Sequence, residues 1–135
     1  MGQFKKAIFI GRIAPDTGIN EYRRLAKKLK LELTEYTHTP NAARFLPKYD
    51  VAFVSRYLAI LEALAAGIPV VAHYNNAIKY DYLNMAPFAK FIKIFQDPKD
   101  ADLKFDPKIV KQGQFWARKQ TWDKLAATYE KLWQE

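Results

Sequence analysis

The chain has 135 residues, of which 50% are hydrophobic and 15% aromatic, so it can bury a substantial core and does not have the composition of a disordered protein. It contains no cysteine, which excludes a disulfide framework, a thiolate nucleophile and a thiolate metal site. Its formal net charge of +8 fits either a solvated lysine-rich surface or a partner with phosphates, namely a nucleotide, a nucleic acid or an anionic membrane surface.

Short apolar runs alternate with amphipathic segments along the chain. The apolar or alternating runs predict strands over residues 7–11 (AIFIG), 31–36, 51–54 (VAFV), 69–72 (PVVA) and 91–94. The periodic segments predict helices over residues 18–31, 41–46 and 57–66, from Pro107 onward, and after Thr121. Strands that alternate with helices indicate a parallel sheet with right-handed crossovers. We therefore expect one α/β domain over residues 1–135, a Rossmann-like parallel sheet flanked by helices.

Sheets of this kind bind ligands beyond the carboxyl ends of their strands, so the residues there are the first candidates for a site. No apolar run is long enough to cross a bilayer and no signal peptide opens the chain, so we expect a cytoplasmic protein.

Two polar pairs directly follow predicted strands. Gly11 and Arg12 follow the first strand, where a glycine lets a ligand approach the backbone and an arginine can bind a phosphate through two hydrogen bonds. Ser55 and Arg56 follow the 51–54 strand, where free N–H groups of the next helix can hold an anion. Each pair also fits a structural role, as a turn glycine with a surface arginine or as a serine that caps the helix.

Glu62 is a lone carboxylate within the apolar run ILEALAAG at 60–67. A charge in that setting must be solvated, paired or used on a ligand. It follows Ser55 by seven residues, close to two helical turns, and so lies on roughly the same side of the helix as the helix start. A carboxylate can accept hydrogen bonds from the two vicinal hydroxyls of a ribose, and the structural alternative is a pair with a lysine. We favour the ligand because the neighbouring residues are apolar.

His73 follows the 69–72 strand at the same expected edge, so it is a further candidate for a polar contact with a ligand, the alternative being an ordinary strand-end histidine. His38 and His73 are isolated and the carboxylates do not cluster, so no metal site is expected.

The segment 50–55 and the stretch LEALAAGIPVVA at 61–72 resemble the nucleotide-sugar site of retaining GT-B glycosyltransferases, in the C-terminal, donor-binding domain of those enzymes. The opening FIGRI at 9–13 resembles the first strand and basic turn of that domain, and 121–132 is similar to its closing helix. The resemblance implies that Glu62 binds the nucleotide ribose, that Arg12 contacts the diphosphate, and that the helix starting at Tyr57 helps to hold the phosphates. The implied donor substrate is a nucleotide-diphosphate sugar, with no further cofactor.

The chain departs from the family pattern at three points. The family usually carries two glutamates separated by seven residues, and the first of them faces the donor sugar. The corresponding position before Glu62 is Val54, so the sugar-facing glutamate is missing. The family's lysine before the helix-opening glycine is Thr17 here. A GT-B enzyme also has two such domains, so we expect a partner subunit or a homodimer to supply the acceptor half. The apolar face of the final helix, with Trp122, Tyr129 and Trp133, is the predicted docking surface.

We therefore expect a glycosyltransferase-like domain that binds a nucleotide-diphosphate sugar. One alternative is a catalytically degenerate binding or scaffold module of the same fold, which the missing glutamate favours. A further alternative is a glycosyltransferase that modifies nucleic acid, with the lysines following the phosphates; steep salt dependence of DNA binding would support it.

Overall fold

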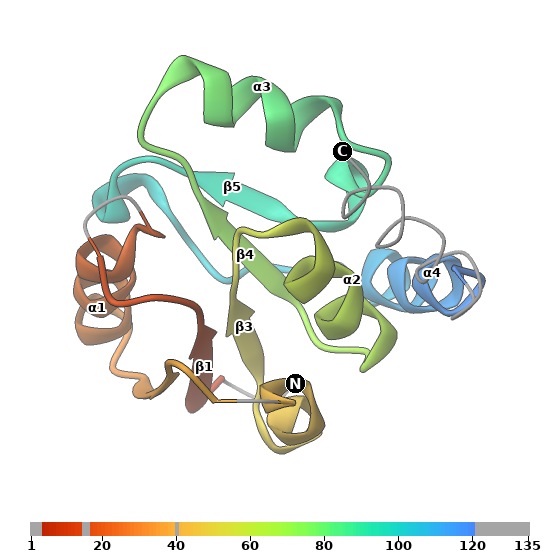
Figure 1. Cartoon of the computed structure of the whole chain (residues 1–135), viewed down its shortest axis with the longest axis horizontal. Helices are drawn as coiled ribbons and strands as arrows, with labels where there is room; N and C mark the ends of the chain where they lie inside the picture. Colours follow the sequence, from red (N-terminus) through yellow and green to blue (C-terminus); the bar gives the residue numbers. More distant parts are fainter. Residues whose placement is uncertain (1–3, 15–16, 40, 121–135) are drawn as a thin grey trace.

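The structure, a computed structural model, describes residues 4–14, 17–39 and 41–120. Five parallel strands form one sheet in the order β2-β1-β3-β4-β5 (Figure 1). The strands are β1 Lys6–Ile10, β2 Glu32–Tyr36, β3 Val51–Phe53, β4 Val70–His73 and β5 Lys93–Phe95. The α-helices are α1 Ile19–Lys28, α2 Tyr57–Ala65, α3 Ala77–Met85 and α4 Pro107–Arg118, and the 3-10 helices are η2 Ala42–Lys48, η3 Ala89–Phe91 and η4 Pro98–Asp100. The expected α/β fold, a parallel sheet flanked by helices, is confirmed.

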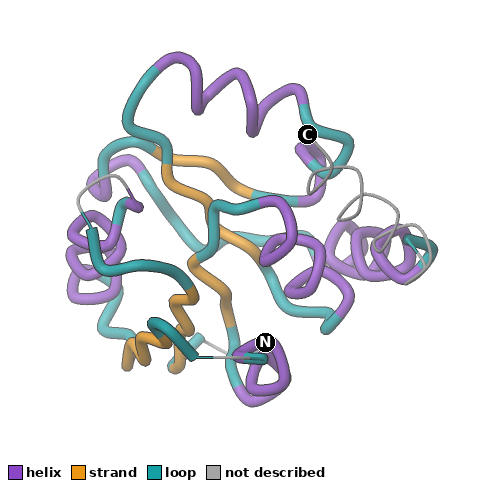
Figure 2. Tube along the Cα trace, viewed as in Figure 1, coloured by secondary structure: helices purple, strands orange, loops and turns teal. Residues whose placement is uncertain are grey.

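Helices cover both faces of the sheet because alternate strand residues point to opposite sides. Ala7 and Phe9 of β1 pack with α1 on one face, whereas Ile8 packs with α2, α3 and α4 on the other. Figure 2 shows the strands running between these two groups of helices. The central strands β3 and β4 are buried on both faces, which is why their sequences are almost continuously apolar.

Helix α1 follows the predicted amphipathic pattern, with one buried stripe of Ile19, Tyr22, Leu25 and Ala26. It begins after Gly18, whose φ of 80° is a left-handed conformation that glycine adopts without a steric penalty. A Cβ at Gly18 would also lie 2.5 Å from Nδ1 of His73, so the start of α1 rests directly on the histidine at the end of β4.

Helix α2 is apolar on most sides because it lies between the sheet and α4, against which it makes many of its contacts. Gly67 ends it with a φ of 81°, and the N–H of Ile68 donates to Ala63 O at 3.3 Å. Pro69 then leads directly into β4. The sequence GIP is thus the turn that returns the chain from helix to strand.

Two expectations about local structure need correction or fall outside the described residues, and one helix was not expected. The segment predicted as a helix at 41–46 is the 3-10 helix η2, with Pro47 inside it. Helix α3 was not predicted, because its residues show no clear apolar period. The helix expected after Thr121, with its docking face of Trp122, Tyr129 and Trp133, lies outside the described residues.

Candidate functional site

The carboxyl ends of β1 and β3 lie side by side, with Phe9 paired with Phe53 in the sheet register. From β1 the chain crosses to β2 on one side, and from β3 it crosses to β4 on the other. The connections therefore diverge and leave a crevice between the two strand ends, which is the usual ligand position in an open parallel sheet. Gly11 and Arg12 follow β1 here, and Ser55 and Arg56 follow β3, as the sequence predicts.

The loop after β1 is held by hydrogen bonds to its own backbone and to the end of β2. The Thr17 hydroxyl lies 2.9 Å from Arg12 O and 2.7 Å from Ala14 O, and the N–H of Gly11 donates to Tyr36 O at 3.2 Å. These contacts fix the path of the chain on both sides of Arg12. Thr17 is the residue that stands in place of the lysine of the glycosyltransferase family. It holds the loop, and it also lines the crevice.

The start of α2 presents unpaired backbone donors to the same crevice. Arg56 is the N-cap residue, with extended backbone and no side-chain cap, so the expectation that Ser55 caps this helix is wrong. The first N–H groups of an α-helix have no acceptor within the helix and carry partial positive charge. The first turn contains no acidic residue that would neutralise them. Burial raises the pKa of the Tyr22 phenol, and the His73 backbone and the nearby Ser55 side chain lower it less strongly.

These residues enclose a pocket of about 180 Å³, which we call the switch-point pocket. Its lining comprises Phe9, Ile10, Gly11, Arg12, Thr17, Ser55, Arg56 and Lys79. Pockets for drug-sized ligands measure roughly 300–1,000 Å³, so this one can take a phosphate-sized group and not a whole nucleotide. Three of its lining side chains are cationic and two carry hydroxyls. Four of the six predicted site residues therefore meet at one cavity.

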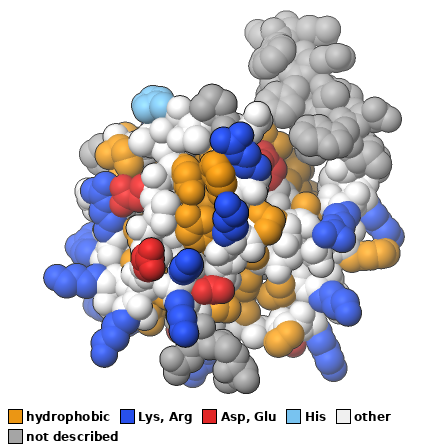
Figure 3. Space-filling model, turned by 90° about the horizontal axis from the view of Figure 1, so that it is seen from below, with side chains coloured by type: hydrophobic (Ala, Val, Ile, Leu, Met, Phe, Trp, Pro, Cys, Tyr) orange, Lys and Arg blue, Asp and Glu red, His pale blue; other side chains and the backbone are white. Residues whose placement is uncertain are grey.

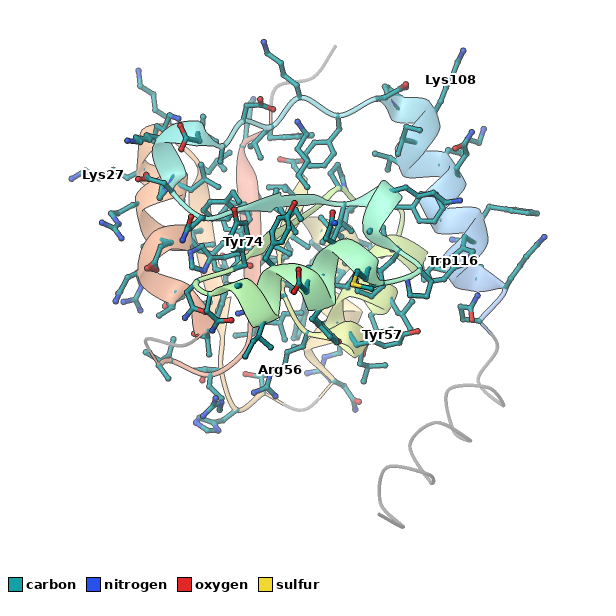
Figure 4. All side chains as sticks on the ribbon, turned by 90° about the horizontal axis from the view of Figure 1, so that it is seen from above. Lys27, Arg56, Tyr57, Tyr74, Lys108 and Trp116 are labelled. Atoms are coloured by element: carbon teal, nitrogen blue, oxygen red, sulfur yellow. The ribbon has the colours of Figure 1, made fainter. Side chains whose placement is uncertain are left out.

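Lys79 is the cationic residue of the pocket lining that the sequence analysis missed, because α3 itself was not predicted. Asn76 is the N-cap of α3, and its Oδ1 accepts the N–H of Lys79 at 2.8 Å. Asparagine is a favoured N-cap residue, and this was the available signal for a helix start. In Figure 4 the labelled Arg56 and Tyr57 lie beside α3, in keeping with Arg56 and Lys79 lining the same pocket.

Glu62 lies on α2 outside the lining of the switch-point pocket. It is partly buried and no hydrogen bond or ion pair joins it to another described side chain. Burial raises the pKa of this carboxyl above its usual value. The lysine partner that the structural alternative required is therefore not present among the described residues, while the proposed ribose contact stays a prediction.

His73 is almost fully buried, with 2% of its surface exposed, and does not line the pocket. Its Nε2 lies 3.0 Å from Gln96 O, and because a carbonyl only accepts, Nε2 carries the proton. Nδ1 is then an unprotonated acceptor with no hydrogen-bond donor among the described residues. Burial lowers the pKa of His73 below its usual value. The ring lies against Tyr22 and Phe95, so His73 is built into the aromatic core beneath α1.

The remaining charge of the molecule does not single out a partner. On the face shown in Figure 3, lysine and arginine side chains project from several sides and hydrophobic side chains are exposed between them. Among the described residues, no group of three or more His, Asp or Glu side chains is placed to hold a metal ion. Within the same residues no helix has the length and apolar character needed to cross a membrane.

Comparison with known proteins gives no family assignment. No family model matches the chain, and no curated protein sequence matches it. Among solved structures the chain is similar to a flavodoxin of Streptococcus pneumoniae TIGR4, with 15% sequence identity and a TM-score of 0.43 over 91% of this chain and 98% of that chain.

The resemblance to the donor domain of GT-B glycosyltransferases is wrong. The strand order β2-β1-β3-β4-β5 is the flavodoxin-like order and not the 3-2-1-4-5-6 order of the dinucleotide-binding Rossmann fold, and no family model matches the chain. The stretch LEALAAGIPVVA resembles the glycosyltransferase site because any buried helix that leads into a buried strand needs the same kinds of residue. Helix α2 needs apolar residues, its end needs a left-handed glycine, and β4 needs β-branched residues.

Proposed function

We propose that this chain binds a phosphorylated small molecule, with a phosphate in the switch-point pocket. The observation that carries the proposal is the convergence of Arg12, Arg56 and Lys79 on one small cavity at the point where the strand connections diverge. Charged donors form hydrogen bonds to phosphate about twice as strong as neutral ones. The N–H groups at the start of α2 add donors with the same polarity.

Arg56 is the best placed of the three cations to bind a ligand. Its side chain is exposed, and no described side chain forms an ion pair or hydrogen bond with it. An incoming phosphate therefore displaces no internal partner of Arg56. The phosphate would also lie beside the Ser55 hydroxyl, whose O–H can donate a hydrogen bond to a phosphate oxygen.

The pocket volume limits what it holds to the phosphate and the atoms next to it. The rest of the ligand would extend over the open surface of the strand ends, where Tyr57 is 37% exposed at the start of α2. Nucleotide-diphosphate sugars are the ligands that the sequence analysis predicted, and nucleoside diphosphates carry the same phosphates. They are the first members of this chemical class to test.

Binding is proposed in preference to a chemical step. Among the described residues that line the pocket there is no carboxylate and no imidazole, the usual groups for general acid or base catalysis at neutral pH. This favours the binding-module alternative of the sequence analysis. A partner subunit that supplies further groups, or a homodimer, stays a prediction.

The test is calorimetric titration and thermal unfolding with inorganic pyrophosphate, ADP, UDP and UDP-glucose. A ligand at a hundred times its dissociation constant should stabilise the fold by about 2.7 kcal/mol. Arg56→Gln should weaken binding by about tenfold to a hundredfold, which corresponds to a hydrogen bond to a charged group of roughly 1.5–3 kcal/mol.

The matched control is Arg24→Gln, which removes the same charge from an exposed position on α1, where Arg24 makes only a 3.6 Å contact with Glu21. It should leave the affinity within about twofold. Equal losses in the two variants would show that net charge and not the pocket binds the ligand. No stabilisation by any of the four ligands at millimolar concentration would refute the proposal.

A further inference from the structure

A second and larger hollow lies at the opposite end of the sheet. Phe4, Leu31 and Pro69 line it, and these residues precede β1, β2 and β4, so the hollow is at the amino ends of the strands. Its volume is about 1200 Å³, and we call it the amino-end groove. Its remaining lining residues are Leu29, Gly67, Leu103, Lys104, Phe105, Asp106, Pro107, Val110, Lys111 and Gln114.

The apolar residues of the groove lie at the edge of the core beneath α1. Phe4, Leu29, Leu31, Leu103 and Phe105 all pack against that core while staying only partly buried. Val110 extends the apolar lining onto α4. These partly exposed side chains give the groove an apolar lining.

Most of the polar groups in the groove already have partners within the protein. The Asp106 carboxylate caps α4 by accepting the N–H of Lys108 at 2.9 Å. The Gln114 amide donates to Ala65 O at 3.3 Å. Lys104 and Lys111 remain, and neither ammonium group forms an ion pair or hydrogen bond with another described residue. The groove thus combines an apolar interior with two lysines and one carboxylate, Asp106, so the charged groups of its lining are positive in sum.

We propose that the amino-end groove binds a long-chain fatty acid, with the acyl chain on the apolar residues and the carboxylate at Lys104 and Lys111. The volume exceeds the roughly 1,000 Å³ upper end of ordinary small-molecule pockets, which suits a long flexible chain better than a compact metabolite. The lysines can reach the head group while their alkyl stems stay against the apolar lining. An uncharged hydrocarbon would leave these charges unused, and an acidic but polar ligand would leave the apolar surface exposed.

Calorimetric titration with octanoate, decanoate and laurate below their micelle concentrations tests the proposal. Affinity should rise with chain length by roughly fourfold for each methylene that becomes buried. Dodecanol, which has the same chain without the charge, should bind more weakly than laurate. Inorganic pyrophosphate should not compete, because the switch-point pocket is at the other end of the strands.

Two variants assign the binding to the groove. Lys104→Gln with Lys111→Gln should weaken laurate binding by roughly twofold to thirtyfold, the range for two exposed ion pairs. The matched control is Lys27→Gln with Lys108→Gln, which removes two lysines that point away from the body of the molecule (Figure 4) and are not in the groove lining. Val110→Asp should weaken laurate further, because the bound acyl chain would cover a charged carboxylate and take it out of water, with circular dichroism to confirm folding.

Three results would overturn the inference. Laurate and dodecanol could bind equally, the control pair could weaken laurate as much as the groove pair, or the acids could fail to bind at all. If the acids fail to bind, light scattering should then measure the oligomeric state. A dimer that dissociates in the Val110→Asp variant would show that a second copy of the chain covers the groove in place of a fatty acid.

Discussion

The hydroxyl of Tyr22 ties helix α1 to the centre of the sheet, and its removal tests how the fold is held together. Tyr22 is fully buried, and its hydroxyl accepts the N–H of His73 at 2.8 Å and donates to Val71 O at 3.3 Å. Its ring stacks on Phe53 with the centroids 5.1 Å apart and an angle of 13° between the ring planes. Tyr22→Phe removes the hydroxyl alone and keeps the ring.

The two hydrogen bonds of this hydroxyl are not equally costly to lose. Val71 O keeps a second donor, the N–H of Val54 at 3.2 Å, so it stays satisfied in the variant. The N–H of His73 has no other acceptor among the described residues and becomes a buried donor without a partner. Such a group costs about 1–3 kcal/mol. For a domain of this size that corresponds to a fall in Tm of roughly 3–12 °C.

Urea unfolding followed by circular dichroism measures this difference, with Tyr80→Phe as the matched control. Tyr80 is 37% exposed and packs edge-on against Tyr74, so water can replace whatever its hydroxyl contacts. The control should change the free energy of unfolding by less than about 0.5 kcal/mol. If Tyr22→Phe also changes it by less than about 0.5 kcal/mol, the His73 N–H is satisfied in another way and the reasoning fails.

Three further predictions concern the residues around the strand ends. Gly18→Ala should destabilise the fold by more than about 2 kcal/mol, because it combines a left-handed backbone with a Cβ 2.5 Å from the His73 ring. Thermal unfolding should show a smaller loss of stability for Gly67→Ala, whose Cβ would meet only a flexible glutamine amide. Burial lowers the pKa of folded His73, so the unfolded chain binds the extra proton first, and the free energy of unfolding should fall as the pH drops below about 6.5, by at most about 1.4 kcal/mol per pH unit. Urea titrations at several pH values should show that His73→Gln reduces this slope. Burial raises the pKa of Glu62, so its ionisation destabilises the folded state above the unfolded pKa of about 4.3; Glu62→Gln should therefore be at least as stable at pH 7, with the advantage vanishing in acid, whereas a loss of about 3 kcal/mol or more would reveal a buried ion pair.

The elements of the sheet and the first helix could be predicted from sequence because each follows a local rule. The strands at 51–54 and 69–72 are apolar runs because both of their faces are covered, and they appear as β3 and β4 within a residue or two of the expected bounds. Helix α1 shows its buried stripe at helical spacing and was expected on that basis. Placing candidate residues after strands was enough to bring Gly11, Arg12, Ser55 and Arg56 to one edge.

Helix α3 shows where local rules stop. It buries only Leu83 fully and leaves Ile78 and Met85 about four-fifths exposed, so its sequence carries no apolar period. Its position is fixed by packing against β5 and η3 and by the Asn76 cap. Lys79 joins the pocket through that packing alone, which is why no pattern around it in the sequence indicated a ligand contact.

The sequence by itself determined that strands and helices alternate, that the sheet is parallel, and which polar residues stand at the strand ends. Burial on one face leaves a period of two in a strand or of 3.6 in a helix, and burial on both faces of a strand leaves a continuous apolar run. The order of the strands, the tautomer of His73, the partner of Tyr22 and the composition of both hollows were decided by the tertiary structure. Each of these depends on contacts between residues far apart in the chain, such as Tyr22 with His73 or Phe4 with Phe105. The energy of such a contact depends on how separate elements pack. The period within one element shows which of its faces is buried but not which other element covers that face.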